Sequence, residues 1–505
     1  MKFRLVTLAA MLATGSAYAL TPAQIDADRA NGTLKEVVVH GGSAQAPLFG
    51  AYMASICNSD LDTYFNSGGS GTGKDYRAYA CTLKAAVPGG WKANTPVLLI
   101  KRDLGGSIYG VNPIALQNPE NTMSVDNSAN NCIPTGNQAT ATVPSYTCAN
   151  FALRQAIAGI SDVEPGVFNA TMTVGSTKTN INLPNGNDDN GNPWTLLTSK
   201  QVSGLNTSTA NQTIFGVAVS LPLRNAMQAA QGLNVGSDAA GDQPSMPRAF
   251  YAAGVSGFVQ SGVANHAGWD ALTGNSADNA LQVNICRRAN GSGTQASSNL
   301  LFLKAGTIAS TSAGGLAPLP GNGVGVALSG NPIAVIENSS TGAAISCLVS
   351  ASGLGAYAMG IISFENDPNG AAWRFVKLDG AAPAQSTARM GGYPYVFAAT
   401  VQWKSAAPGN PDKQTLAFLT QLRGNVGSPD GIAALLDPNA QRGVLAPPSS
   451  YAGACASQTP GSNAARFGSC VERLDLSSTF NSGKLLYGSS KGYATNSSQD
   501  LHIVK

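Results

Sequence analysis

The sequence predicts an α/β fold from a pattern that recurs along the chain. Short apolar runs have the length and β-branched content of buried strands, and each ends at a glycine-rich turn. The runs are Glu36–His40, Val97–Lys101 and Val283–Cys286, followed by the turns Gly41–Ser43, Gly105–Ser107 and Gly291–Gly293. Helical periodicity occurs at residues 47–56, 223–231 and 415–422. Strands, glycine turns and helices in this order are typical of α/β proteins.

Size and composition limit the number of domains and the classes of function that the chain can have. The chain has 505 residues, of which 43% are apolar, which is enough for a large core and two or more domains. Charged residues make up 11%, against roughly a quarter in an average soluble protein. The net charge of +3 gives the chain no electrostatic reason to coat nucleic acid or anionic lipid. Nucleic-acid binding is therefore excluded as the main activity.

Residues 1–19 have the features of a secretory signal peptide. Lys2 and Arg4 supply the positive start, Leu5–Ala13 is a short apolar run, and Ala17–Ala19 matches an A-x-A cleavage site. The apolar run is too short to span a membrane, and no later stretch offers about 18 consecutive apolar residues. We expect a mature protein that begins at Leu20 and is exported to the periplasm, with secretion or a cell-surface location left open.

Eight cysteines in an exported chain indicate disulfides. They are Cys57, Cys81, Cys132, Cys148, Cys286, Cys347, Cys455 and Cys470. Sequence alone cannot choose among their connectivities, but we favour sequential pairing because the second and fourth pairs each bracket a Gly/Ser/Asn/Pro-rich loop. A zinc site is disfavoured, since there is no C-x-x-C and the histidines are His40, His266 and His502. No metal or other cofactor is predicted.

Two short motifs resemble catalytic ones; the first is better explained as a flexible surface loop and the second as a turn. Gly68–Lys74 (GGSGTGK) nearly spells a phosphate-binding P-loop, but Asp75 stands where Ser or Thr should hold magnesium. Gly488–Gly492 (GSSKG) fits the nucleophile elbow, yet only Asp500 and His502 follow it. With three histidines in the chain, general acid–base catalysis has few candidates. The sequence therefore predicts a binding protein and no enzyme.

The segment Arg288–Thr294 (RANGSGT) points to anion binding. If a helix starts at the Ser-Gly-Thr turn, its free backbone N–H groups, two hydroxyls and the guanidinium converge on one point. The alternative is a Gly/Ser loop beside a surface arginine. A converging set of this kind is suited to a tetrahedral oxyanion.

The segment resembles the R-x-D-G-S-G-T motif of periplasmic phosphate-binding proteins of the high-affinity ABC phosphate transporter. Further segments resemble that family's motifs in the expected order, across residues 36 to about 403. These are Gly41–Phe49 (G-A-T-F-P-A-P-L-Y in the family), Leu104–Gly110 (G-S-x-x-G), Gly159–Pro165 (G-A-S-D-x-P), Gly268–Asp270 (W-D), Tyr357–Phe364 (I-G-Y) and Tyr393-Pro394 (W-P-I). Each motif is short, so their order carries the resemblance.

The resemblance implies a two-lobed periplasmic-binding-protein type II fold with hinge strands and disulfide-bonded loop insertions. Lobe one would be residues 20–215 and 394–505, with a C-terminal extension, and lobe two would be residues 216–393. Loop-rich insertions are expected at residues 112–149 and 447–469. The ligand would lie between the lobes, and its binding would close them by a hinge motion.

The resemblance also implies a role for each residue of a ligand shell. Ser43 donates a hydroxyl and backbone N–H, Ala44 a backbone N–H, and Ser107 a hydroxyl, with Ser70 as a rival for that place. Asp162 accepts a hydrogen bond from a protonated ligand oxygen, which favours hydrogen phosphate over sulfate; helix capping is its structural alternative. Arg288 supplies charge, and Ser292, Gly293 and Thr294 complete the shell. Asn290 stands where the family has a second acid.

The function implied is binding of inorganic phosphate, or a similar oxyanion, by a monomer that serves an inner-membrane ABC permease. Two alternatives remain open at this point. One is a secreted phosphatase or phosphoester-binding relative on the same scaffold, which would need a group to activate water. The other is a cell-surface interaction protein that displays the disulfide-bonded loops.

Overall fold

A computed structural model of the chain describes most of it. The described residues are 20–67, 75–136, 140, 142–169, 171–174, 177–256, 268–303, 307–308, 333–447 and 461–470. The expected signal peptide, the turn at residues 68–74 with Ser70, Cys455 and the motif at residues 488–492 lie outside them.

The predicted α/β class is confirmed, with a large central sheet as its main feature. In spatial order its strands are β16 (Ile333–Asn338), β14 (Val283–Arg288), β17 (Ala358–Ser363), β12 (Leu205–Ser220), β20 (Val396–Lys404), β9 (Ala158–Ser161), β1 (Lys35–Gly41), β4 (Pro96–Arg102), β3 (Tyr76–Thr82), β2 (Asp62–Asn66), β7 (Tyr146–Cys148) and β6 (Cys132–Pro134), with β18 (Trp373–Phe375) and β21 (Val444–Leu445) paired to β12. Smaller sheets pair β10 (Thr171–Val174) with β11 (Thr177–Asn180) and β15 (Thr307–Ile308), β13 (Ser245–Met246) with β19 (Lys377–Leu378), and β5 (Glu120–Met123) with β8 (Phe151–Arg154).

Helices alternate with these strands along the described part of the chain. They are α1 (Pro22–Ala30), α2 (Ala46–Ile56), α3 (Asn112–Leu116), α4 (Ser199–Ser203), α5 (Leu221–Ala230), α6 (Arg248–Ser256), α7 (Asp270–Thr273), α8 (Gly293–Ser298), α9 (Thr341–Gly353), α10 (Gln385–Arg389), α11 (Lys413–Val426), α12 (Pro429–Ala433), α13 (Pro438–Arg442) and α14 (Asn463–Phe467). The helices predicted at residues 47–56, 223–231 and 415–422 are confirmed as α2, α5 and α11.

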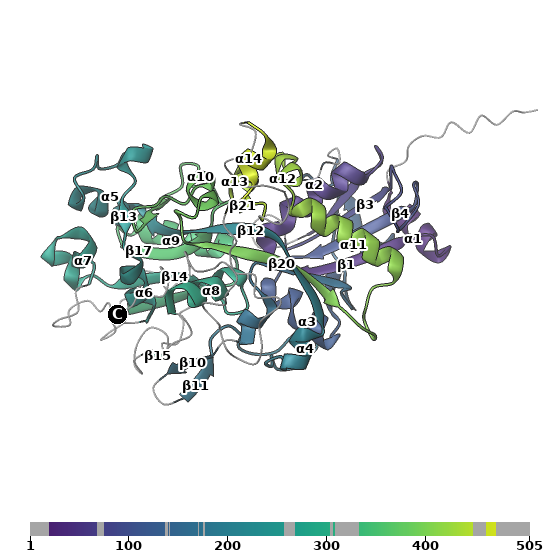
Figure 1. Cartoon of the computed structure of the whole chain (residues 1–505), viewed down its shortest axis with the longest axis horizontal. Coiled ribbons are helices and arrows are strands. Elements are labelled where there is room, and N and C mark those ends of the chain that lie inside the picture. The colour runs from purple at the N-terminus through teal and green to yellow at the C-terminus, as the bar shows by residue number, and fades with distance from the viewer. Residues whose placement is uncertain are drawn as a thin grey trace, which may run out of the picture.

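Two long antiparallel strands, β12 and β20, connect two parallel parts of the sheet. On one side β1 pairs in parallel with β4 and β9, and on the other β14 pairs in parallel with β16 and β17. Figure 1 shows these two parts at opposite ends of the long axis, with β12 and β20 between them. The chain divisions predicted at residues 215 and 393 fall within β12 and shortly before β20. The two lobes as separate units remain a prediction.

Both faces of the sheet are buried, as the continuous apolar strands require. On β1, Val38 packs into one hydrophobic cluster, whereas Val37 and Val39 pack into another. Side chains alternate between the faces of a strand, so neighbouring residues serve different cores. The second cluster includes α11, whose first turn is capped by Asp412 and which buries Phe418 against the sheet.

The expected loop-rich segment at residues 112–149 contains more regular structure than predicted. It forms α3, β5 and the β6–β7 hairpin, and β5 pairs with β8 just beyond it. These strands have three or four residues each and carry little hydrophobic pattern of their own. Tertiary pairing forms them, which a single sequence does not show.

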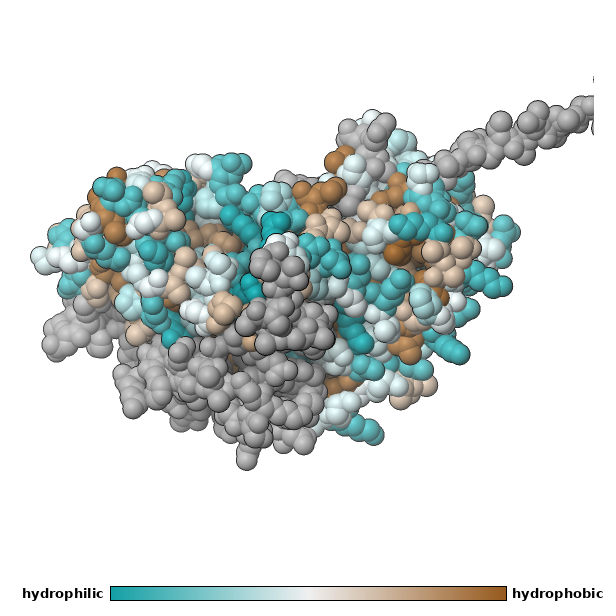
Figure 2. All heavy atoms as spheres, turned by 45° about the horizontal axis from the view of Figure 1, so that its top comes forward, coloured by the Kyte–Doolittle hydropathy of each residue, from teal (hydrophilic) through white to brown (hydrophobic). Residues whose placement is uncertain are grey.

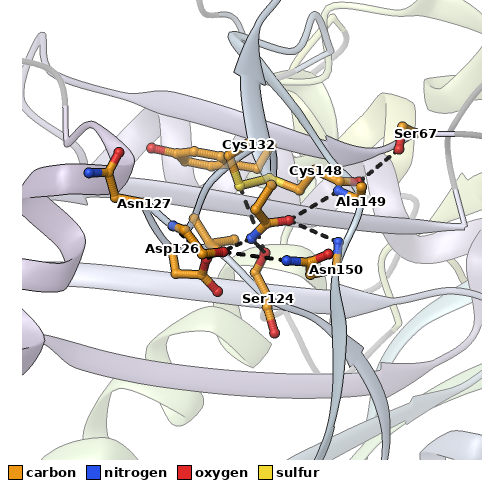
Figure 3. The surroundings of a disulfide bond; sticks show 12 residues. Ser67, Ser124, Asp126, Asn127, Cys132, Cys148, Ala149 and Asn150 are labelled. Atoms are coloured by element: carbon orange, nitrogen blue, oxygen red, sulfur yellow. Dashed lines mark hydrogen bonds between the residues drawn. A yellow bond between two sulfur atoms is a disulfide. The ribbon is translucent and has the colours of Figure 1, made fainter.

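Sequential disulfide pairing is confirmed for three pairs: Cys57–Cys81, Cys132–Cys148 and Cys286–Cys347. Cys470 is also disulfide-bonded, and Cys455, its expected partner, lies outside the described residues. The second disulfide joins the two strands of the β6–β7 hairpin, as Figure 3 shows. Asn131 fixes its surroundings by donating to the carbonyl of Ser124 and accepting from the N–H of Ala149.

All eight cysteines are expected to be oxidised in the exported protein. Mass spectrometry of the unreduced mature chain should show eight fewer hydrogen atoms than the reduced chain, one for each cysteine. Thiols that react with an alkylating reagent under denaturing, non-reducing conditions would contradict this expectation.

The surface is mixed in hydropathy. Hydrophilic and apolar residues are interspersed over the face shown in Figure 2. None of the described helices has both the length and the apolar character needed to cross a bilayer.

Candidate functional site

The glycine turns predicted from the sequence meet at one edge of the central sheet. Strands β1, β4 and β9 are parallel neighbours, so the turns that follow them lie at the same end. These turns carry η1 (Ser43–Gln45), η2 (Ser107–Gly110) and Asp162. Gly110 packs closely on β9, since a Cβ there would lie 2.1 Å from the carbonyl oxygen of Ile160. Glycine thus allows η2 to lie directly on the strands.

Asp162 and Ser107 bind each other across two of these turns. The Ser107 hydroxyl donates to Asp162 Oδ2 over 2.9 Å and accepts from the Asp162 N–H over 3.0 Å. Asp162 Oδ1 is buried with no hydrogen-bond partner, and it lies 3.0 Å from the Cβ position of Gly42. Burial raises the pKa of the Asp162 carboxyl above its ordinary value, although Ser107, Gln45 and two cations, Lys101 and Arg288, lower it. Ser107 therefore holds one carboxylate oxygen in place, and the Gln45 side chain also acts on this carboxyl as a hydrogen-bond donor.

The turn after β14 packs directly against this pair. The Ile108 N–H donates to the carbonyl of Gly291 over 3.0 Å, which connects the two turns. A Cβ on Gly293 would lie 2.4 Å from Ser107 Oγ and 2.7 Å from the Asp162 Cβ. Only glycine fits there, because such separations are far below van der Waals contact.

Gly293→Ala is therefore expected to lower the stability of the protein by about 1–3 kcal/mol, as overpacking of a dense interior does. Gly353→Ala is a matched control, because no atom lies within 4 Å of a Cβ at that helix end. Thermal unfolding of both variants measures the difference. Equal melting temperatures would show that the two turns do not pack as described.

A cavity of about 420 Å³ opens beside these turns and holds two of the predicted residues, Ser43 and Arg288. Its described lining is Ser43, Asp75, Arg77, Asp103, Leu104, Gly105, Arg288, Ser339, Ser340, Thr341, Gly342, Glu365 and Asn366. Ser43 is exposed and belongs to the turn after β1, whereas Arg288 is the last residue of β14. The cavity therefore lies between segments from the two parallel parts of the sheet.

Arg288 is a buried cation without a carboxylate partner among the described residues. Its side chain donates to the Thr341 hydroxyl over 2.8 Å and to the Ser339 carbonyl over 3.0 Å, and its Nε has no partner. Only 6% of the residue is exposed. Burial lowers the pKa of Arg288 to about 10, and the attraction of Asp162 opposes this shift. A guanidinium placed in this way favours an anion beside it.

Three charged residues next to the cavity were not among the predicted site residues. Lys101 is fully buried and bonds to Asp103 over 2.7 Å, and Asp103 also accepts from Arg77 over 2.9 Å. Burial lowers the pKa of Lys101, and Asp103 opposes that shift. Lys101 follows the apolar residues of β4 directly. The sequence gives no sign that a charged residue at this position is buried.

Glu365 is a further carboxyl on the cavity wall. It follows β17 and accepts a hydrogen bond from Ser363 over 2.6 Å. Burial raises the pKa of Glu365 to about 7, with repulsion from Asp162 adding to the effect and Ser363 and Arg442 opposing it. Near neutral pH this carboxyl is thus partly protonated.

The remaining predicted residues lie around the same turns. Ala44 is half-buried in η1, while Ser292 and Thr294 are buried at the start of α8. The Ser292 side chain makes no capping bond to that helix. Asn290, which replaces an acid of the family motif, has a buried Oδ1 without a partner.

No protein-family model matches the sequence, and no curated protein matches it either. Comparison with solved structures gives phosphate-transport binding proteins, all at low identity and with TM-scores below 0.5. A protein assigned as a phosphate ABC transporter substrate-binding protein, solved with phosphate, from Clostridium perfringens is 11% identical with a TM-score of 0.37, covering 79% of this chain and 96% of that one. PstS from Borrelia burgdorferi is 11% identical with a TM-score of 0.34, covering 82% and 98%. An ABC-type phosphate transport receptor from Vibrio cholerae is 16% identical with a TM-score of 0.27, covering 45% and 70%. At these values none of them assigns a role to a residue of this chain.

Proposed function

We propose that this protein is an exported solute-binding protein that binds inorganic phosphate, or a similar tetrahedral oxyanion, beside Ser43 and Arg288. The observation that carries the proposal is Arg288, a buried cation on the cavity wall whose Nε has no partner. Asp162 Oδ1, a buried acceptor of the neighbouring turns, is not part of the described lining of the cavity. The first can donate a hydrogen bond and the second can accept one. Hydrogen phosphate accepts and donates at once, whereas sulfate at neutral pH only accepts.

Asp162 is the element that would select the ligand. A deprotonated oxygen beside its carboxylate would bring two acceptors together in a dry site. A buried polar group without a partner costs about 1–3 kcal/mol, so the site penalises a ligand that has no proton. The proposal extends to a periplasmic monomer that delivers its ligand to an ABC permease, with residues 20–215 and 394–505 forming one lobe and residues 216–393 the other.

Phosphate is expected to stabilise the purified mature protein. A ligand at 100 times its dissociation constant adds about 2.7 kcal/mol to the free energy of unfolding. The measurement is the melting temperature after bound ligand has been removed by unfolding and refolding, with phosphate, arsenate and sulfate added separately. An unchanged melting temperature in millimolar phosphate would reject the proposal.

Glu365 keeps phosphoester hydrolysis open as a second candidate function. It lies in the cavity, and with a pKa of about 7 it is suited to take up a proton near neutral pH. A chromogenic phosphoester assay on the wild type and on Glu365→Gln separates the two functions. Turnover that is lost in the variant would establish an enzyme, and its absence would leave binding as the function.

A further inference from the structure

We propose that the oxyanion in this cavity is bound at the first turn of α9, by the backbone N–H groups of Thr341 and Gly342 together with the guanidinium of Arg288. This inference rests on the proposed function and adds two backbone donors that the sequence motifs do not include. The ligand class is a phosphoryl group, either free as phosphate or carried on a small monoester.

The first turn of α9 has backbone donors that the helix itself cannot use. In the 13-residue helix α9, the first N–H groups have no intrahelical acceptor. Ser340 caps the helix by accepting from the N–H of Ala343 over 3.1 Å. The N–H groups of Thr341 and Gly342 have no acceptor among the described residues, and both residues line the cavity. Their donors and the helix dipole favour an anion at this point.

The position of Arg288 is an independent sign of an anion site. Arg288 lies opposite Asn338 in the parallel pair β14–β16. The residues that directly follow β16 therefore lie next to the guanidinium. Thr341 and Ser339 accept from its two terminal nitrogens, which holds it against the start of α9. Its Nε has no partner, and no described carboxylate forms an ion pair with it. A buried guanidinium and free helix amides on one cavity wall are complementary to one oxyanion.

Three further carboxyls line the cavity, and two of them, Asp103 and Glu365, are compatible with this assignment; the third, Asp75, has interaction partners of its own. Asp103 is neutralised by Lys101 and Arg77, so it does not act as a free anion. Glu365 is partly protonated near neutral pH. The volume of about 420 Å³ falls in the range of roughly 300–1,000 Å³ found for small-molecule sites, which leaves room for a substituent on the phosphoryl group.

Thr341→Pro tests the backbone donor directly. Thr341 is the first residue of α9, where proline is well tolerated, and Ser340 has the extended conformation that a residue before proline prefers. The variant removes the N–H and the hydroxyl together, so Thr341→Val, which removes the hydroxyl alone, is its control. Calorimetry should show phosphate binding at least tenfold weaker in Thr341→Pro than in Thr341→Val.

Gly342→Asp tests the same site by charge. A Cβ at Gly342 meets only the Ser340 hydroxyl, at 3.9 Å, so a side chain fits. An aspartate in the first turn stabilises a helix but places a negative charge where the oxyanion would lie. Phosphate binding should weaken at least tenfold relative to the neutral, isosteric Gly342→Asn, without loss of melting temperature.

The outcomes separate this inference from the proposed function. If the wild type binds phosphate and both test variants bind it as their controls do, the α9 site is wrong and the proposed function stands. If the wild type binds sulfate but no phosphate, phosphate as the ligand and Asp162 as the selective element both fail, and the same variants titrated with sulfate decide the α9 site. If neither ion binds, both proposals fail. Tighter binding of methyl phosphate than of phosphate identifies the monoester as the ligand, and the reverse order identifies the free ion.

Discussion

Replacement of Arg288 by alanine is expected to weaken phosphate binding more than any other single truncation in the cavity. The guanidinium is buried and bears a charge without a carboxylate partner among the described residues. Truncation of a buried, charge-assisted contact costs about 2–5 kcal/mol, which corresponds to roughly 30-fold to several-thousand-fold in the dissociation constant. Calorimetric titration with phosphate measures the loss.

Arg287→Ala is the matched control, because Arg287 is adjacent to Arg288 on β14 but binds a different partner. Arg287 forms an ion pair with Glu337 over 2.7 Å and is absent from the described lining of the cavity. It should retain the affinity of the wild type. A large loss in Arg287→Ala with little change in Arg288→Ala would reverse the assignment.

Asp162→Asn is expected to shift selectivity towards sulfate. The amide keeps the shape of the carboxylate and can still accept from Ser107, but it now also donates a hydrogen bond. The ratio of sulfate affinity to phosphate affinity should rise about 5-fold to 150-fold, since the penalty for an unpaired acceptor is about 1–3 kcal/mol. Competition calorimetry on the wild type and the variant measures the ratio. An unchanged ratio would remove Asp162 as the selective element.

The same variant has an expected effect on stability. Burial raises the pKa of Asp162 in the folded state, so the folded protein binds more protons than the unfolded chain above the ordinary pKa of an aspartate. Its stability therefore falls as the pH rises from that value to the folded pKa, and the loss persists at neutral pH. Ligand-free Asp162→Asn should lack this loss and melt at a higher temperature at pH 7. An unchanged melting temperature would mean that the buried charge of Asp162 does not lower the stability of the folded protein.

Local patterns predicted the elements that form the frame of the site. The runs before Gly41, Gly105 and Gly291 became β1, β4 and β14, because apolar β-branched residues that end at glycine have few alternatives. The hairpin of β6 and β7 was predicted as loop, since its strands depend on a disulfide and on pairing with β2. Such long-range causes leave little trace in the local sequence.

The residues of the site also fall into those that the sequence predicted and those that it missed. Motif order singled out Ser43 and Arg288, which are 245 positions apart and line one cavity. It did not indicate that Ser107 and Asp162 would bind each other, because their contact depends on how the turns after β4 and β9 meet. The start of α9 was missed as well. Ser339–Gly342 could have been noticed as a helix start after the apolar run 333–336, but nothing local connects it to Arg288.

The disulfide between Cys286 and Cys347 determines how these experiments must be prepared. It joins β14, two residues before Arg288, to the middle of α9, and thereby fastens the strand that carries the guanidinium to the helix whose first turn faces it. Protein produced in a reducing cytosol would lack this covalent link. A failed titration on such material would report on the oxidation state of the sample, so the oxidised protein, recovered from an exporting host, is the proper starting material for each measurement.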